Sequence, residues 1–173
     1  MRLRVLQHSM IYILIITLLL SCSTKQQNDE YAVFTCPSQN FVVSCLNKIA
    51  DIDKVESVSI DNDPNGLLYK PKGYMSATYF TLFNITNDTS KTPIIAGTDG
   101  GGCIEVYPTF ELAEERSQYL STFDTGWCIT SGYHKKIGST IIRISDKLTE
   151  EQYTQLEEKI INMFITEQKY FNK

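Results

Sequence analysis

The stretch STIIRISDKLTEEQYTQLEEKIINMF, residues 139–164, indicates the fold class of this chain. Its first six residues, 139–144, are β-branched and apolar enough to predict a strand. Thr149 and Gln152 then have the spacing of a capping box, the signature of a helix start. The apolar residues that follow recur at three and four positions, as on one face of a helix: Tyr153, Leu156, Ile160, Ile161 and Phe164. A strand therefore leads directly into an amphipathic helix.

Similar patterns upstream complete the fold. They predict a helix at 38–50, strands at 55–60, 73–83 and 103–107, and a helix after Pro108 with Thr109 as N-cap. Residues 124–136 are expected to be irregular. The order α-β-β-β-α-β-α predicts an α+β fold. We expect a two-layer sandwich in which three helices cover one face of a mainly antiparallel sheet of about four strands.

The N-terminal segment has the pattern of an export signal. Arg2 and Arg4 precede an apolar run of about eleven residues, Met10 to Leu20. A helix that crosses a bilayer needs roughly 20 apolar residues, whereas about 7 to 15 suffice for a signal segment. The run ends Leu19-Leu20-Ser21-Cys22, which resembles the lipobox of bacterial lipoproteins.

That resemblance implies cleavage between Ser21 and Cys22, a diacylglyceryl thioether on Cys22 and a third acyl chain on the new amino terminus. One acyl chain binds a membrane only marginally, so two or three chains should anchor the protein stably. We therefore expect it at the cell membrane, facing outside the cytoplasm. The alternative is a short buried helix that ends in cysteine, which would not explain the arginines before the run.

Three segments follow from this pattern. Residues 1–21 are the expected lipoprotein signal peptide, and 22–30 comprise the lipidated cysteine and a flexible polar tether, STKQQNDE after Cys22. Residues 31–173 have the length of a single globular domain.

The charge of the mature chain excludes one class of partner. The signal segment holds two of the 16 Lys and Arg and none of the 20 Asp and Glu, which leaves a net charge of −6. Proteins bind nucleic acid largely by neutralising its phosphates with Lys and Arg. An acidic domain therefore argues against nucleic acid, and the expected partners are the membrane, through the lipid, and a ligand at the envelope.

Four cysteines remain once Cys22 is acylated: Cys36, Cys45, Cys103 and Cys128. An even number in an exported domain predicts two disulfides, which allows three connectivities. Their spacings do not fit a structural zinc site. A bridge between Cys36 and Cys45 is awkward, because a helix over this stretch would hold their Cα atoms too far apart. The pairing stays open.

The loop Asp61-Asn62-Asp63-Pro64-Asn65-Gly66 matches the first half of a calcium-binding loop. Asp61, Asp63 and Asn65 would supply the alternating oxygen ligands. The twelfth position of such a loop should be glutamate, and here it is Lys72. We favour a turn rich in Asp and Asn, with Gly66 at positive φ, over a calcium site.

The other motifs argue against catalysis. The run GTDGGG at 97–102 lacks the Lys-Ser/Thr pair of a phosphate-binding loop and predicts a flexible connector. The one histidine of the mature chain, His134, is expected in a solvated loop, and no G-x-S-x-G occurs. Four acidic residues cluster around the start of the second predicted helix: Glu105, Glu111, Glu114 and Glu115. Their interaction with the helix dipole explains most of them.

Three stretches together resemble a group of uncharacterised small lipoproteins and secreted proteins of Gram-positive bacteria. These are residues 62–66 running into Gly73-Tyr74, the strand 102–107 with a helix ending at 119–123, and 138–145 leading into Leu148-Thr149. The resemblance implies no activity. Cys103 stands where a small residue is usual in this group and Cys128 looks like a local addition, which weakly favours pairing these two.

These observations predict a lipid-anchored domain that binds a partner at the cell envelope without catalysing a reaction. The alternative is a small envelope enzyme or an enzyme inhibitor. A deep pocket lined by carboxylates with perturbed pKa values around Glu105 would favour the enzyme. No cofactor is expected beyond the calcium ion considered for the Asp61 loop.

Overall fold

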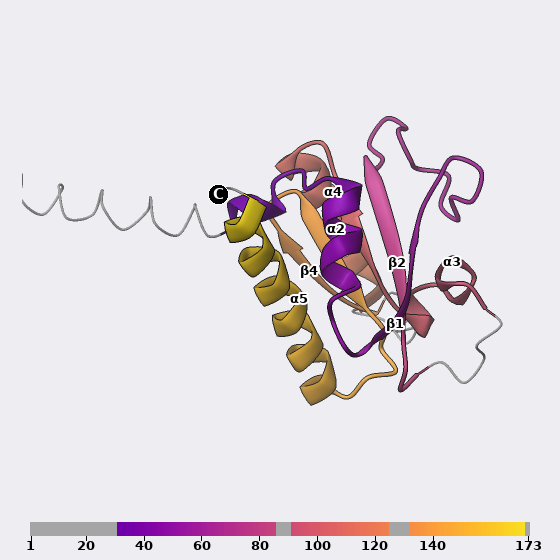
Figure 1. The fold of residues 1–173 in the computed structure, drawn as a ribbon. Coiled ribbons are helices and arrows are strands. Elements are labelled where there is room, and N and C mark those ends of the chain that lie inside the picture. Colours follow the sequence, from indigo (N-terminus) through magenta and orange to yellow (C-terminus); the bar gives the residue numbers. More distant parts are fainter. Residues whose placement is uncertain (1–30, 86–90, 125–131, 172–173) are drawn as a thin grey trace, which may run out of the picture. The chain divides into compact units, whose positions relative to one another are not determined.

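The computed structural model describes residues 31–85, 91–124 and 132–171. The chain separates into two units, Met1–Ala32 and Val33–Lys173, and the second contains the folded domain (Figure 1). The predicted signal peptide, the tether and Cys22 lie outside the described residues, as does Cys128. Within the described ranges, no helix is long and apolar enough to cross a membrane.

A single antiparallel sheet forms the centre of the domain. Its strands are β1 (Ile52–Ser57), β2 (Ser76–Leu82), β3 (Gly101–Val106), β4 (Tyr133–Ile137) and β5 (Thr140–Ile144). They lie in the order β1-β2-β3-β5-β4, and every neighbouring pair is antiparallel. The expected α+β class and its antiparallel sheet are confirmed, with five strands rather than about four.

The additional strand is β4, in a stretch expected to be irregular. It forms a hairpin with β5 through the two-residue turn Gly138-Ser139, in which Gly138 has a φ of 58°. A positive φ at the first central position is what such tight hairpin turns require. The strand was missed because its sequence, YHKKI, lacks the apolar run of a central strand and forms an edge of the sheet.

Helices precede, connect and follow the strands: η1 (Ala32–Phe34), α2 (Gln39–Leu46), α3 (Pro93–Ala96), η2 (Thr98–Gly100), α4 (Phe110–Asp124) and α5 (Glu150–Phe171). The caps are those that the sequence predicts. The hydroxyl of Thr109 accepts from the backbone N–H of Leu112 at 3.3 Å. At the start of α5, Thr149 and Gln152 exchange side-chain to backbone hydrogen bonds of 3.0 and 3.3 Å.

The helices cover both faces of the sheet, which corrects the expected two-layer arrangement to three layers. Ile104 and Ile142 pack in one core with α2 and α5, whereas their neighbours Cys103 and Ile141 pack in a second core with α4. Figure 1 shows α2 and α5 in front of the sheet and α4 behind it. An amphipathic stripe shows that a helix buries one side, but it does not show which face of the sheet it covers.

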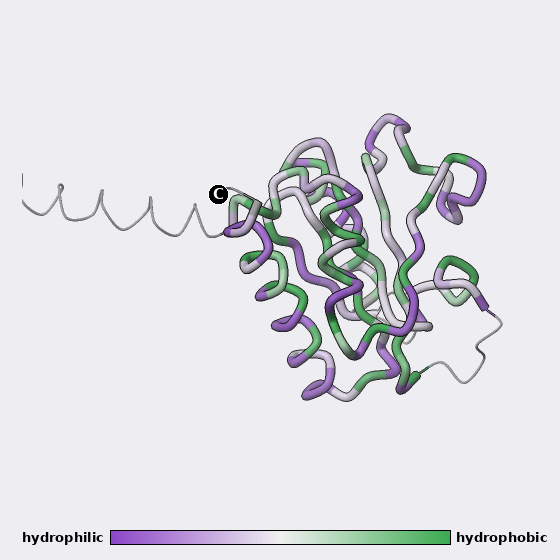
Figure 2. Tube along the Cα trace, viewed as in Figure 1, coloured by the Kyte–Doolittle hydropathy of each residue, from purple (hydrophilic) through white to green (hydrophobic). Residues whose placement is uncertain are grey.

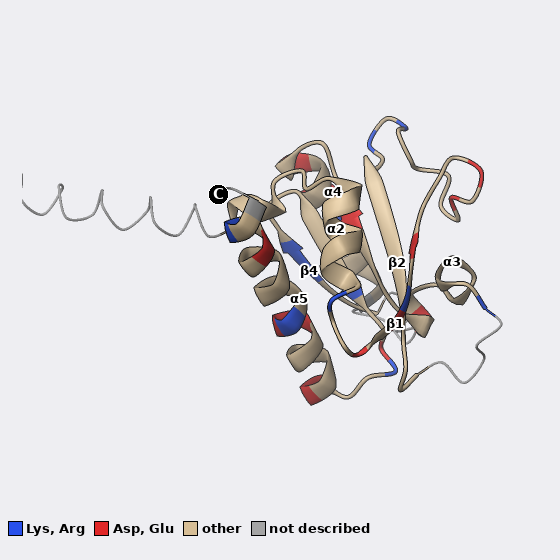
Figure 3. Cartoon of the chain, viewed as in Figure 1, with Lys and Arg blue, Asp and Glu red and all other residues tan. Residues whose placement is uncertain are grey.

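The burial of the central strands agrees with helices on both faces of the sheet. Every residue of β2, β3 and β5 is buried, so these strands are covered on both faces rather than one. Hydrophobic residues run through the strands and recur along α5 (Figure 2). Charged residues lie mainly on helices, loops and the edge strands, and β2 has none (Figure 3).

Candidate functional site

The carboxylate of Glu105, the residue around which a catalytic pocket was considered, lies on β3 beneath α4 and is fully buried. Arg116 of α4 donates from Nε to Oε2 at 2.9 Å and from Nη2 to Oε1 at 3.0 Å. Arg143 of β5 donates to Oε1 at 3.0 Å, and the Tyr107 hydroxyl donates to Oε2 at 2.9 Å. Each carboxylate oxygen therefore accepts two hydrogen bonds.

This network keeps Glu105 ionised. Burial by itself would raise the pKa of the carboxyl, but the hydrogen bonds and positive charges of Arg116 and Arg143 outweigh it and hold the pKa below its usual value. A general acid at neutral pH needs the opposite shift. These ion pairs join α4 to strands β3 and β5 of the sheet.

The other acidic residues of the predicted cluster are exposed on α4 and do not converge on Glu105. Glu114 pairs with Lys136 at 3.1 Å, and Glu115 with Lys72 at 3.0 Å. A hydrogen bond from the backbone N–H of Glu111 itself, followed by one from Thr109, lowers the pKa of the Glu111 carboxyl. These groups hold the first turns of the helix and its neighbours together.

His134 lies on β4 opposite Arg143, rather than in the solvated loop that the sequence suggests. Its Nε2 lies 3.4 Å from the Ser121 hydroxyl oxygen. That hydroxyl donates to the carbonyl of Ser117 at 3.0 Å, one turn back in α4. The Ser121 hydroxyl therefore bonds the backbone of α4 as well as lying near His134.

The Asp61–Gly66 loop is a turn held together by Asp63. Its carboxylate accepts from the backbone N–H of Asn65 at 3.0 Å and of Leu68 at 2.7 Å, and from the Tyr74 hydroxyl. Gly66 has a φ of 63°, as the turn interpretation predicts.

Of the three residues considered as calcium ligands, Asp63 uses its carboxylate for hydrogen bonds within the turn. The amide nitrogen of Asn65 points toward the hydroxyls of Tyr74 and Tyr79, at 3.4 and 3.3 Å. Asp61 is exposed. In the described part of the chain, no three or more His, Cys, Asp or Glu side chains gather as they would around a metal ion.

The described cysteines are separate free thiols. Cys45 is buried in the core with α2 and α5, and Cys103 in the core on the other face of the sheet. The Cys36 thiol donates to the carbonyls of Tyr107 and Pro108, at 3.4 and 3.5 Å. Bridges among these three are therefore not formed, contrary to the expectation of two disulfides, while Cys128 lies outside the described residues.

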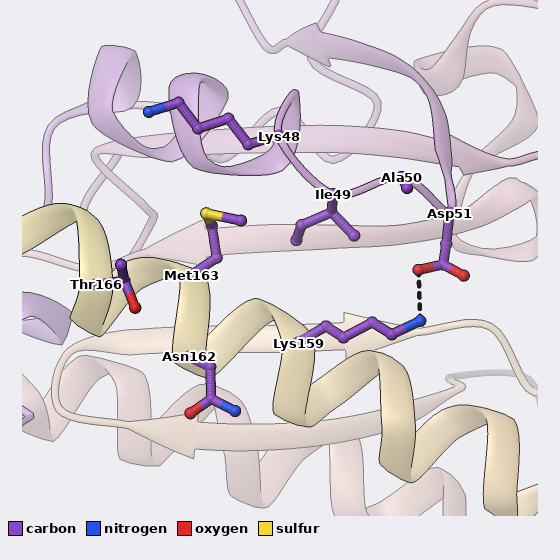
Figure 4. Close-up of a pocket in the computed structure, with 8 residues that line it drawn as sticks. All are labelled: Lys48, Ile49, Ala50, Asp51, Lys159, Asn162, Met163 and Thr166. Carbon is purple, nitrogen blue, oxygen red and sulfur yellow. Dashed lines mark hydrogen bonds and ion pairs between the residues drawn. The ribbon is translucent and has the colours of Figure 1, made fainter.

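A groove beside α5, which we call the α5 groove, is the candidate binding site. One section has a cavity volume of about 370 Å³ and lies between residues 48–51 and the helix (Figure 4). From α5 it is lined by Lys159, Asn162, Met163 and Thr166. We call it the apolar section, because apolar atoms supply most of its surface and Ile49, Ala50 and Met163 are among the residues that line it.

A second, polar section of about 180 Å³ continues the groove toward the start of α5. Its lining combines the end of β2 with the first turns of the helix: Asp51, Leu82, Asn84, Leu148, Gln152, Gln155, Leu156 and Lys159. The two sections share Asp51 and Lys159. These two side chains form an ion pair, with 2.7 Å between Lys159 Nζ and Asp51 Oδ2 (Figure 4). Another ion pair, Lys48 with Glu167, borders the apolar section.

None of the groove residues was predicted from the sequence as functional. They come from residues 48–51, the end of β2 and one side of α5 with the residue that precedes it by two positions, and they share no motif. Met163 continues the apolar stripe of α5 and packs against the core, so its position in the sequence does not set it apart as a groove residue.

Comparison of the chain with models of protein families, with curated proteins and with solved structures finds no match.

Proposed function

We propose that this chain is a bacterial lipoprotein, anchored by acyl chains on Cys22, whose folded domain binds a partner at the cell envelope without catalysing a reaction. The observation that carries the binding role is the α5 groove. Its apolar section, about 370 Å³, is of the size of ligand sites, which combine apolar surface with a few placed polar groups. Ile49 and Met163 supply apolar surface, and Asp51 and Lys159 supply polar groups.

The remainder of the chain supports this proposal. The order of arginines, short apolar run and Leu-Leu-Ser-Cys at the N-terminus favours lipid anchoring over a membrane-spanning helix. Glu105 is saturated by four hydrogen bonds and serves the packing of α4. The catalytic alternative therefore has no specific observation in its favour.

Site-specific photo-crosslinking in intact cells tests the binding role. A photoreactive amino acid replaces Asn162, which is exposed in the groove wall, in the full-length lipidated protein. The control replaces Thr122, exposed on α4 across the sheet. We expect a discrete crosslinked species from position 162 that disappears when Thr166→Arg fills the groove. No species at 162, or equal species from both positions, would contradict the proposal.

A further inference from the structure

We propose that Asn65 is a site of spontaneous covalent modification, at which the backbone nitrogen of Gly66 displaces the side-chain amide, and that this modification loosens the Asp61–Gly66 turn. The proposal does not depend on the binding function. It follows from the pair Asn65-Gly66, from the exposure of both residues and from the contacts that hold them in the turn.

The reaction joins the asparagine side chain to the backbone that follows it. The nitrogen of Gly66 gives its proton to water and attacks Cγ of Asn65. A bond between this nitrogen and Cγ forms, the bond from Cγ to Nδ2 breaks, and Nδ2 takes up a proton and leaves as ammonia. Water then opens the resulting cyclic imide at either carbonyl, which gives aspartate or isoaspartate at position 65. Water is the only co-reactant, and no group is oxidised or reduced.

The residue after the asparagine determines whether its nitrogen can approach Cγ. Glycine has no Cβ to obstruct the approach and adopts more backbone conformations than any other residue. Asn65 and Gly66 are both exposed, so water can reach the imide. A Cβ built on Gly66 would meet no atom within 4 Å, so the backbone has room to move.

The native hydrogen bonds hold both reacting groups loosely. The backbone N–H of Gly66 donates to the carbonyl of Asp63 at 3.4 Å. The side-chain amide of Asn65 donates to the hydroxyls of Tyr74 and Tyr79, at 3.4 and 3.3 Å. Common N–H···O distances are about 2.9–3.0 Å, so all three bonds are long and weak. The attacking nitrogen and the leaving amide are therefore less restrained than they would be in a helix or a sheet.

Asn162 offers a comparison within the same chain. It is exposed like Asn65 but lies in α5, where the backbone N–H of the next residue, Met163, belongs to the hydrogen-bond ladder of the helix. Met163 also carries a side chain that obstructs the approach of its nitrogen. We expect Asn162 to stay intact under conditions that convert Asn65.

The product changes the charge of the turn. Asp63 accepts a hydrogen bond from the Tyr74 hydroxyl, and that hydroxyl accepts one from the Asn65 amide. A carboxylate at position 65 cannot donate this bond, and it places a second negative charge near Asp63. Isoaspartate also adds a carbon to the backbone, which disrupts the hydrogen bond from Gly66 to Asp63. Conversion therefore weakens the turn.

The test incubates the purified, folded full-length protein at mildly alkaline pH and follows each asparagine by peptide mass spectrometry. An isoaspartate-specific methyltransferase gives an independent readout of the second product. We expect conversion at Asn65, and conversion at least about tenfold slower in Gly66→Ala. The matched control is Gly97→Ala, because Gly97 also has a positive φ and open surroundings but follows Ala96. This control should leave the rate at Asn65 unchanged.

The consequence for the turn has its own readout. Asn65→Asp reproduces one product and should lower the urea concentration at the midpoint of unfolding. An Asn65 that stays intact in the folded protein would overturn the proposal, and conversion in the urea-unfolded chain alone would show that the turn protects it. Equal rates at Asn65 and Asn162, or a rate unchanged by Gly66→Ala, would also overturn the proposal. A midpoint unchanged in Asn65→Asp would overturn the loosening of the turn.

Discussion

Two arginines and a tyrosine hydroxyl surround the Glu105 carboxylate in the core beneath α4. A buried charge is stable only when it is paired and hydrogen-bonded, and both conditions hold here. The dependence is mutual, because Arg116 and Arg143 are themselves largely buried, with side chains 14% and 10% exposed. Removing Glu105 therefore takes from both buried guanidinium groups the carboxylate that they share.

Glu105→Gln should lower the free energy of unfolding by about 3–5 kcal/mol, since the two guanidinium groups then face a neutral amide. Urea denaturation of purified protein measures this. The control is Glu114→Gln, which breaks an exposed ion pair with Lys136 and should change stability by less than about 1 kcal/mol. A loss at Glu105 as small as that at Glu114 would contradict the role of the network.

The cysteines allow a second test at the same scale. Burial is the main cause that raises the pKa of the Cys45 thiol to about 12, and burial also raises that of Cys103. Reaction requires the thiolate, so both should resist alkylation in the native protein. Cys36 is exposed and should react.

Alkylation without prior reduction, followed by mass spectrometry, shows which of these cysteines are modified. We expect one modification among these three cysteines in the native state and all three after denaturation. If all three remain unmodified after denaturation until a reductant is added, disulfides are present, as the cysteine count alone predicts.

The Asp61–Gly66 turn depends on the charge of one side chain. Burial by itself would raise the pKa of Asp63, but hydrogen bonds from Tyr74 and from the backbone of Leu68 and Asn65 outweigh it, so the pKa is lowered. A lowered pKa stabilises the fold above the unfolded value of about 3.9, and this stability is lost as the pH falls through the folded value.

Asp63→Asn should therefore be less stable than the wild type near pH 7, and the difference should close in strong acid. Chemical denaturation across pH 2 to 7 measures it, with the exposed Asp61→Asn as control. Hydrogen bonds to a charged group contribute about 1.5–3 kcal/mol, which sets the scale of the loss at neutral pH. A difference that stays constant with pH would show that the carboxylate charge is not involved.

Calcium separates the two interpretations of the same loop. As a turn alone, it should leave the melting temperature unchanged in calcium and lose about 1 kcal/mol on Gly66→Ala, because the added Cβ meets no neighbour and only the positive φ is strained. A site of about 10⁻⁴–10⁻³ M would instead stabilise the protein by roughly 1.4–2.7 kcal/mol at about 10 mM calcium. A stabilisation abolished in Asp61→Asn/Asp63→Asn would contradict the turn interpretation.

Elements whose signals are local could be predicted from the sequence. Thr149 and Gln152 cap α5 as their spacing predicts, because both hydrogen bonds lie within one turn of the helix. The strand β4 could not, since its formation depends on pairing with β5 and on the contact of Lys135 with Glu157 of α5. Edge strands are held by such tertiary contacts more than by their own pattern.

In the whole molecule, the stacking of layers and the α5 groove escaped prediction for a common reason. Both depend on which distant segments meet: α4 could have covered either face of the sheet, and the groove joins residues 48–51 and Asn84 with α5. The continuous burial of β2, β3 and β5, which the structure shows, is not evident in the sequence, because these strands also carry Thr, Glu and Arg. No sequence pattern marks the groove either.

Anchoring is a property of the whole molecule and is tested at Cys22. Cys22→Ala should leave an unprocessed or mislocalised precursor and abolish labelling by a palmitate-type fatty-acid probe, because the thioether and the cleavage both require the cysteine. Ser23→Ala is the matched control, since it alters the adjacent residue and keeps the thiol. Its labelling should equal that of the wild type. The two or three acyl chains should also keep the wild type with the membrane fraction through repeated washing, whereas a single chain would give reversible binding. Equal labelling of wild type and Cys22→Ala would contradict the lipoprotein proposal.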